Sequence, residues 1–225
     1  MKNSVLIRIV VILAAYFGLT YFGGDIGRRV LYPIRMLVTF LHEFGHAIGA
    51  LITGGSVDLI QINKDGSGYT QSRGGSLSII LMGGYLGSAI FGNLLFLIGA
   101  RFKKAVKPFL ILLSATMFGT GIFWFNSLFT TIMLVIFALA ILLIAFKTNF
   151  GNEVLMFLGL ACIIFIVQDF NVGPSSDLQK YAALMVFIPK TVWMYIWLGI
   201  VLILTFFNFR IMFKSMKDDD YSANA

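Results

Sequence analysis

Long apolar segments, separated by short polar or basic ones, make up most of this chain. A helix needs about 20 apolar residues to cross the hydrocarbon core of a bilayer, and the pattern predicts seven helices of that kind. They fall at about 4–22, 32–53, 76–100, 108–125, 128–146, 153–168 and 191–213. A shorter apolar piece at about 181–188 predicts a short or re-entrant segment. The pattern therefore predicts an all-α polytopic membrane protein with about seven transmembrane helices.

A more polar stretch, residues 54–75, follows the second of these helices. Successive residues from Val57 to Ile62 would point to opposite faces of a strand, and KDGSG suits a tight turn with Gly66 or Gly68 at positive φ. We predict a β-hairpin here, an ordinary polar loop being the alternative. Because bare strand edges cannot face lipid, the hairpin is expected in the interface or beside a cavity.

The composition agrees with a membrane protein. The 225 residues are 59% hydrophobic and only 12% charged, and the mean hydropathy is +0.91. Soluble domains are nearer about 45–50% apolar and about 25% charged. We therefore expect one membrane-embedded domain over residues 1–225, with the hairpin insertion at 54–75 and a polar tail at 214–225.

The positive charge of the chain has a membrane explanation. The formal net charge is +7, but the basic residues stand at the ends of apolar segments, where anionic lipid headgroups lie. No basic stripe is interleaved with surface aromatics, so nucleic acid is not an expected partner. The single cysteine, Cys162, excludes an internal disulfide and CxxC-type metal sites, and we interpret it as a small buried residue.

The stretch FLHEFGHAIGALITGG, residues 40–55, contains both histidines of the chain. On a helix, residues four apart share one face, so His42 and His46 present their imidazoles side by side. Imidazole is a good zinc ligand, and Glu43, rotated about 100° from His42, is placed to accept a proton from an attacking water. HExxH on a helix is typical of zinc metalloproteases. The alternative is a set of polar residues that holds helices together, but ionisable groups in a membrane span usually mark a functional site.

HEFGHAIGALITGGSVDLIQIN resembles the site-2 protease family of intramembrane zinc metalloproteases, in particular its small bacterial-type members. The resemblance covers about residues 38–93, through GGYLGSAIFGN, with a weaker match at PSSDL, residues 174–178. It implies a multi-pass protein of a bacterial-type cell membrane. It also implies that a Zn2+ ion serves hydrolysis of a peptide bond in or near the transmembrane helix of a membrane protein substrate.

A third metal ligand must come from a carboxylate, because catalytic zinc usually takes three protein ligands and the chain has no third histidine. Outside the hairpin, the early loop and the tail, the candidates besides Glu43 are Glu153, Asp169 and Asp177. The resemblance implies an aspartate from a later helix, although the asparagine–proline–aspartate–glycine and leucine–aspartate–glycine sequences of the family are absent. Asp177, which begins an apparently helical LQKYAAL, is the preferred ligand and Asp169 the substitute; a helix N-cap is the alternative role for Asp177.

These residues make a zinc metallopeptidase the expected function, with His42, His46 and Asp177 as metal ligands and Glu43 as the general base. Asn93, Asn126 and Asn171 are open candidates for stabilising the oxyanion. A scaffold or binding protein of the same fold is the first alternative, and it would follow from a missing ligand. A transporter is the second, but it predicts paired half-repeats that the sequence does not show.

Overall fold

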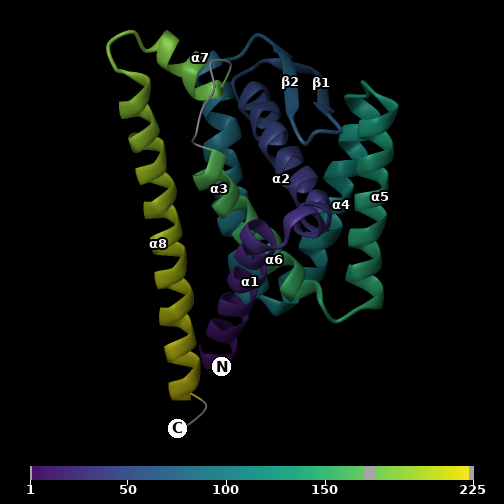
Figure 1. The fold of residues 1–225 in the computed structure, drawn as a ribbon, viewed down its shortest axis with the longest axis vertical. Coiled ribbons are helices and arrows are strands. Elements are labelled where there is room, and N and C mark those ends of the chain that lie inside the picture. The colour runs from purple at the N-terminus through teal and green to yellow at the C-terminus, as the bar shows by residue number, and fades with distance from the viewer. Residues whose placement is uncertain (1, 170–175, 223–225) are drawn as a thin grey trace.

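Eight helices and a two-stranded sheet form the part of the chain that the structure describes, residues 2–169 and 176–222 of a computed structural model (Figure 1). The helices are α1 (Lys2–Phe22), α2 (Gly24–Ile52), α3 (Leu77–Arg101), α4 (Lys103–Phe123), α5 (Leu128–Lys147), α6 (Gly151–Asp169), α7 (Asp177–Leu184) and α8 (Lys190–Ser222). The strands are β1 (Ser56–Ile62) and β2 (Gly68–Arg73). The short predicted segment at 181–188 is α7, which starts and ends earlier than expected.

Six helices of the described residues are long and apolar enough to cross a membrane: α1, α3, α4, α5, α6 and α8. The expected number of seven included the helix that carries HEFGH, but α2 is not among the six. It begins at Gly24 rather than near Tyr32, and its first half contains one aspartate and three arginines. These charges and the polar residues of the HEFGH turn lower the mean hydropathy of α2. Length and hydropathy therefore do not select it as a membrane span.

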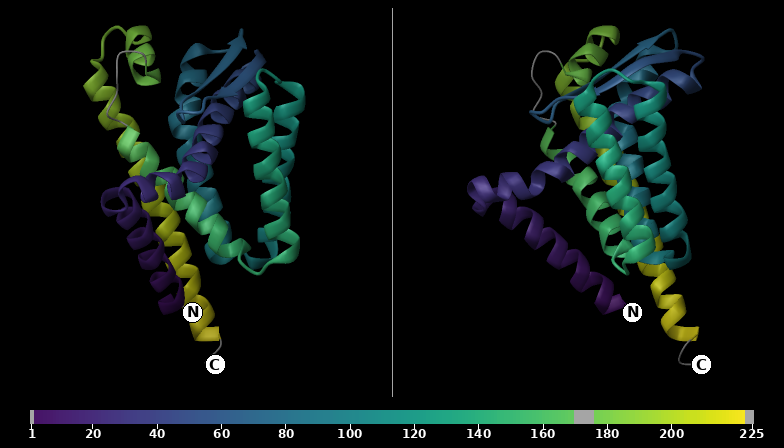
Figure 2. Two further views of the ribbon diagram at one scale, coloured as in Figure 1. Left: turned by 45° about the vertical axis from the view of Figure 1, so that its right-hand side comes forward. Right: turned by 90° about the vertical axis from the view of Figure 1, so that its right-hand side faces the viewer.

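The strands β1 and β2 pair antiparallel within the range predicted for the hairpin, with an irregularity between Val57 and Leu59. Gly66 turns the chain with φ +86°, as the sequence predicted for Gly66 or Gly68. The end of β1 is fixed to α5, because Thr130 Oγ1 accepts from the Ile62 amide at 3.1 Å and donates to the Ile62 carbonyl. The hairpin lies over one end of the helices, beside α7 (Figure 2).

Glycines bring the backbones of α2 and α3 into close contact. A Cβ atom on Gly45 would lie 2.2 Å from the Gly83 carbonyl oxygen, and one on Gly83 would lie 2.5 Å from the Gly45 oxygen. One turn further on, Gly49 meets the backbone of Ile79 and Ile80. Small residues at such crossings are the usual means by which membrane helices approach closely, and here they bring the HEFGH turn against α3.

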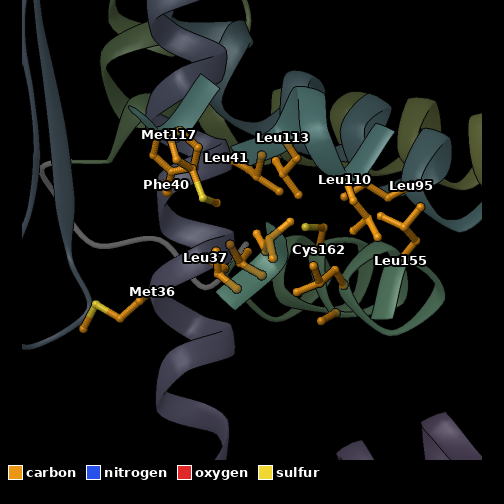
Figure 3. Close-up of a cluster of buried hydrophobic side chains, with 14 of the residues drawn as sticks. Met36, Leu37, Phe40, Leu41, Leu95, Leu110, Leu113, Met117, Leu155 and Cys162 are labelled. Carbon is orange, nitrogen blue, oxygen red and sulfur yellow. The ribbon is translucent and has the colours of Figure 1, made fainter. Parts of the chain in front are cut away.

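The opposite side of α2 packs into the largest apolar cluster. Leu37, Phe40 and Leu41 extend from α2 toward Leu110 and Leu113 of α4 (Figure 3). Because lipid tails are as apolar as these side chains, shape complementarity and dispersion rather than escape from water hold such a cluster together. Cys162 is fully buried in the same cluster, which confirms its interpretation as a small buried residue.

The last helix, α8, runs along one edge of the molecule (Figure 1). Its contact with α3 is polar as well as apolar, since Asn208 Nδ2 donates to the Asn93 carbonyl at 2.8 Å and to Asn93 Oδ1 at 2.9 Å. The helix continues nine residues beyond its predicted end, to Ser222, into the range expected to be a polar tail.

Candidate metal centre

One face of α2 is polar between Arg35 and His46. Arg35, Thr39, His42, Glu43 and His46 all line one cavity, and their spacing of four, three, one and three residues keeps them on the same side of a helix. The cavity measures about 760 Å³ and is also lined by residues of α3, α7 and the β2 side of the hairpin. The imidazoles predicted to be ligands therefore face a polar space rather than lipid.

Three ligating atoms converge in this cavity. Asp177 Oδ2 lies 3.1 Å from His42 Nε2 and 3.0 Å from His46 Nε2, and the two Nε2 atoms are 3.2 Å apart. Ligands held about 2.0–2.2 Å from a tetrahedral zinc ion are roughly 3.3–3.6 Å from one another. The observed triangle matches that spacing within a few tenths of an ångström, so these three residues fit a zinc ion.

Hydrogen bonding determines which nitrogen of His46 is available. His46 Nδ1 lies 2.6 Å from the carbonyl oxygen of Ile80 on α3, an atom that can only accept, so Nδ1 carries the proton. In the neutral imidazole the lone pair is then on Nε2, directed at Asp177 and His42. Bonds of this type to the second ring nitrogen orient histidine ligands in metal sites, and a bound cation displaces any proton that the three ligating atoms share.

Asp177 reaches the histidines because it starts α7 and is not the cap of that helix. The cap is Ser176, whose hydroxyl accepts from the Gln179 amide at 3.2 Å, so the alternative interpretation of Asp177 as N-cap is wrong. Burial alone would raise the pKa of the Asp177 carboxyl, but its hydrogen bonds with His42 and His46 outweigh burial and hold that pKa well below its usual range. The carboxyl is therefore ionised, as a metal ligand must be.

An aromatic cluster holds α7 in place. Leu178 and Tyr181 of α7 pack with Tyr85 of α3 and Trp197 of α8, and the Tyr181 and Trp197 ring centroids are 5.0 Å apart. Tyr85 also meets His42 edge to face at 5.0 Å. The same cluster thus positions the carboxylate and one of the imidazoles.

Gly84 is a residue of this site that the sequence did not reveal. A Cβ atom there would lie 2.5 Å from His46 Nε2 and 2.6 Å from His42 Nε2. The pair Gly83–Gly84 therefore has two functions: the first glycine admits the α2 backbone and the second leaves room for the ligating nitrogens. The doubled glycine was a signal, since packing at i, i+4 spacing requires only one of the two.

The hairpin holds Glu43. Thr70 Oγ1 of β2 lies 2.9 Å from both the carbonyl oxygen and Oε2 of Glu43. A Cβ atom on Gly68 would lie 2.8 Å from Glu43 Cγ, so β2 passes directly over this side chain. Glu43 is only 4% exposed, and β2 fixes the direction of its carboxyl group within the cavity.

The other sequence candidates have different positions. Asn93 donates a hydrogen bond to Thr205 of α8, and Asn126 donates one to Gln61 Oε1 of β1. Neither of these two asparagines is among the described residues that line the cavity. Asn171 and the side chain of Asp169, the substitute ligand, lie outside the described residues. Glu153, in the first turn of α6, pairs with Arg8 of α1 at 2.9 Å, and neither residue lines the cavity.

A comparison with protein-family models matches residues 6–208 to the family described as Peptidase M50B-like. The chain belongs to this family. No match was found among curated proteins or among solved structures.

Membership of the Peptidase M50B-like family confirms the resemblance to site-2 proteases. M50 peptidases are zinc metalloproteases, and the six candidate spans agree with an integral membrane protein. The family match extends over 203 residues, from α1 to α8, and thus includes both the HEFGH helix and Asp177.

Proposed function

We propose that this protein is an intramembrane zinc protease that hydrolyses a peptide bond in or near a transmembrane helix of its substrate. The observation that carries the proposal is the convergence of His42, His46 and Asp177 within hydrogen-bonding distance in one polar cavity. The residue pair His42–Asp177 is separated by 135 positions in the chain. A contact over such a separation is built by the fold as a whole, which favours a functional site over incidental helix packing.

The proposed metal ligands are His42, His46 and Asp177. Zinc held by them would supply Lewis acidity, which would lower the pKa of the attacking water toward about 7 and polarise the scissile carbonyl. Glu43 lies on the same face of α2 and accepts the proton of the attacking water, then returns it to the leaving amine. Thr70 donates a hydrogen bond to the Glu43 carboxylate and holds it toward the reacting atoms.

The substrate is proposed to bind as an added strand. A carbonyl within a helix is already hydrogen-bonded, so the substrate must unwind before it is attacked. In the two-stranded sheet, β2 pairs with β1 along one edge only, and residues Gly68–Ser72 of β2 line the cavity. An extended segment paired to the other edge of β2 would place its backbone beside the metal ligands and satisfy its own amides and carbonyls.

Two measurements on purified protein test the proposal. Asp177→Ala should lose zinc affinity by at least about 100-fold, because only two ligands remain, while Glu43→Gln should keep zinc at one equivalent. Glu153→Gln is the matched control, since it changes the other glutamate of the chain at a distance from the cavity.

Proteolysis is tested by labelling new N termini in solubilised membranes incubated with each protein. Wild-type protein and Glu153→Gln should generate new termini within apolar segments, and Glu43→Gln should generate none. A Glu43→Gln protein that retains cleavage would refute the general-base role. Bound zinc with no cleavage by wild-type protein would favour a non-proteolytic binding protein of the same fold.

A further inference from the structure

The strand β2 runs along α2 in the same direction, from Arg35 toward Ala50. The turn before β2 lies against Arg35, since a Cβ atom on Gly66 would lie 2.6 Å from Arg35 Nε. The chain that follows β2 reaches the far end of α2, since a Cβ atom on Gly75 would lie 3.1 Å from the Ala50 carbonyl oxygen. A substrate segment paired to β2 would therefore extend along α2 and past the metal ligands.

The end of the cavity near the hairpin turn is basic. Arg35 is exposed and lines the cavity, and it comes seven positions before His42, so the helix places both on one face, two turns apart. Arg35 forms no hydrogen bond or ion pair with any residue that the structure describes. Asp65 of the turn interacts with it electrostatically, but the Asp65 carboxylate already accepts from the Ser67 amide and hydroxyl, at 2.9 and 2.7 Å. The guanidinium donors of Arg35 are therefore available to a ligand.

The opposite end of the cavity is apolar. Leu77, Ile80 and Leu81, from the first two turns of α3, line it. Gly49, three positions beyond His46 on α2, meets the backbone of Ile80. The start of α3 thus lies past the metal ligands, on the side away from Arg35. A substrate segment along β2 would meet a cation on one side of the metal centre and apolar side chains on the other.

The carboxylates of the cavity do not neutralise Arg35. The described lining residues include two acids, Glu43 and Asp177, and two basic side chains besides the histidines, Arg35 and Lys180. Lys180 Nζ lies 3.9 Å from Asp177 Oδ1, so Lys180 belongs to the metal centre. Arg35 comes two turns earlier on α2, and no described ion pair connects it to either carboxylate. Its charge is therefore the one that a substrate would meet at the turn end of β2.

We propose that Arg35 is a specificity-determining residue, which binds an acidic side chain of the substrate a few residues from the scissile bond. This inference rests on the proposed protease function. His42 and His46 lie about 10 and 16 Å from Arg35 along the axis of α2, and a strand advances about 3.3 Å per residue, so the acidic residue is about three to five residues from the bond that is cleaved. A guanidinium holds a carboxylate through two parallel hydrogen bonds. On the other side of the scissile bond, the start of α3 favours apolar side chains.

Fluorescent synthetic peptides with a leucine–alanine core test the proposal, each with one glutamate, glutamine or lysine at a scanned position. Binding is measured by fluorescence anisotropy with zinc-loaded Glu43→Gln protein, and cleavage by mass spectrometry with wild-type protein. Glutamate at the stated distance should be favoured about fivefold over glutamine, the upper range for an accessible ion pair. Arg35→Gln should remove this preference, Arg35→Lys should retain part of it and Arg35→Glu should favour lysine instead. Arg29→Gln is the matched control, since Arg29 is on the same helix but not among the described residues that line the cavity.

The two readouts separate this inference from the proposed function. Cleavage without a glutamate preference, or with a preference that Arg35→Gln retains, would overturn the role of Arg35 and leave the protease in place. A preference in binding without cleavage of any peptide would refute the protease and support the acidic subsite. Equal loss of glutamate and glutamine peptides in Arg35→Gln would assign Arg35 to holding the hairpin turn and overturn the proposal, and neither binding nor cleavage would refute both. Zinc content and circular dichroism verify folding, and Arg35→Lys against wild-type protein repeats the comparison if the other variants do not fold.

Discussion

Replacing Gly84 with alanine would test the metal centre from the side of α3, without changing any proposed ligand. The added methyl carbon would lie 2.5 Å from His46 Nε2 and 2.6 Å from His42 Nε2, whereas ordinary contacts begin at 3.4 Å. The imidazoles must therefore move by about 0.9 Å. Metal–ligand distances tolerate only about 0.2 Å, so the required displacement is several times larger than the site allows.

We expect Gly84→Ala to weaken zinc binding by about 10- to 100-fold, or about 1.4–2.7 kcal/mol, as other changes next to metal ligands do. The assay is a titration of purified protein against a chelator of known affinity. Alanine is a better helix former than glycine, so the helix itself should remain intact by circular dichroism. Gly119→Ala in α4 is the matched control, because the nearest atom to its added carbon is 3.9 Å away. Equal zinc affinity of Gly84→Ala and wild-type protein would refute the geometry derived for the two histidines.

Three further changes have defined outcomes. Thr70→Val should lower kcat about tenfold with little change in zinc content, because Glu43 loses its hydrogen bond from β2; Thr70→Ser should restore the rate, and unchanged kinetics would exclude the positioning role. Gly45→Ala should lower the unfolding temperature, because its Cβ would lie 2.2 Å from the Gly83 carbonyl oxygen; a scan that shows no shift would contradict this. Ser176→Ala should cost α7 about 1 kcal/mol and weaken zinc binding severalfold by equilibrium dialysis, and full affinity would show that the cap does not position Asp177.

Local patterns in the sequence predicted the elements well. Apolar runs predicted α3 and α5 within about one residue of their observed bounds, and the glycines of KDGSG predicted the turn at Gly66. The spacing of His42 and His46 predicted that their rings share one face, because that relation depends only on the helical repeat. The position of the hairpin relative to the membrane stays a prediction.

Contacts between segments that are far apart in the chain were harder to predict from the sequence. Ser176 and Gln179 have the spacing of a helix capping box, which indicates the cap of α7. Nothing near Asp177 in the sequence indicates that an aromatic cluster brings this helix to α3. The role of Gly84 follows from where α3 crosses α2, which a single sequence does not specify. The first eight residues of α2, 24–31, were missed because Asp25, Arg28 and Arg29 interrupt the apolar pattern.

The hydrogen bond between Thr70 and Glu43 has a consequence for selectivity. The strand β2, which is proposed to pair with the substrate, also restrains Glu43, the group that accepts the proton. A shift of β2 would therefore also move the Glu43 carboxylate. A polypeptide that pairs poorly with β2 would then be cleaved more slowly, even if it binds as tightly as one that pairs well. In that arrangement, how well a substrate pairs with β2 affects the rate at which it is hydrolysed. An enzyme that binds many sequences with similar affinity can therefore still cleave only some of them.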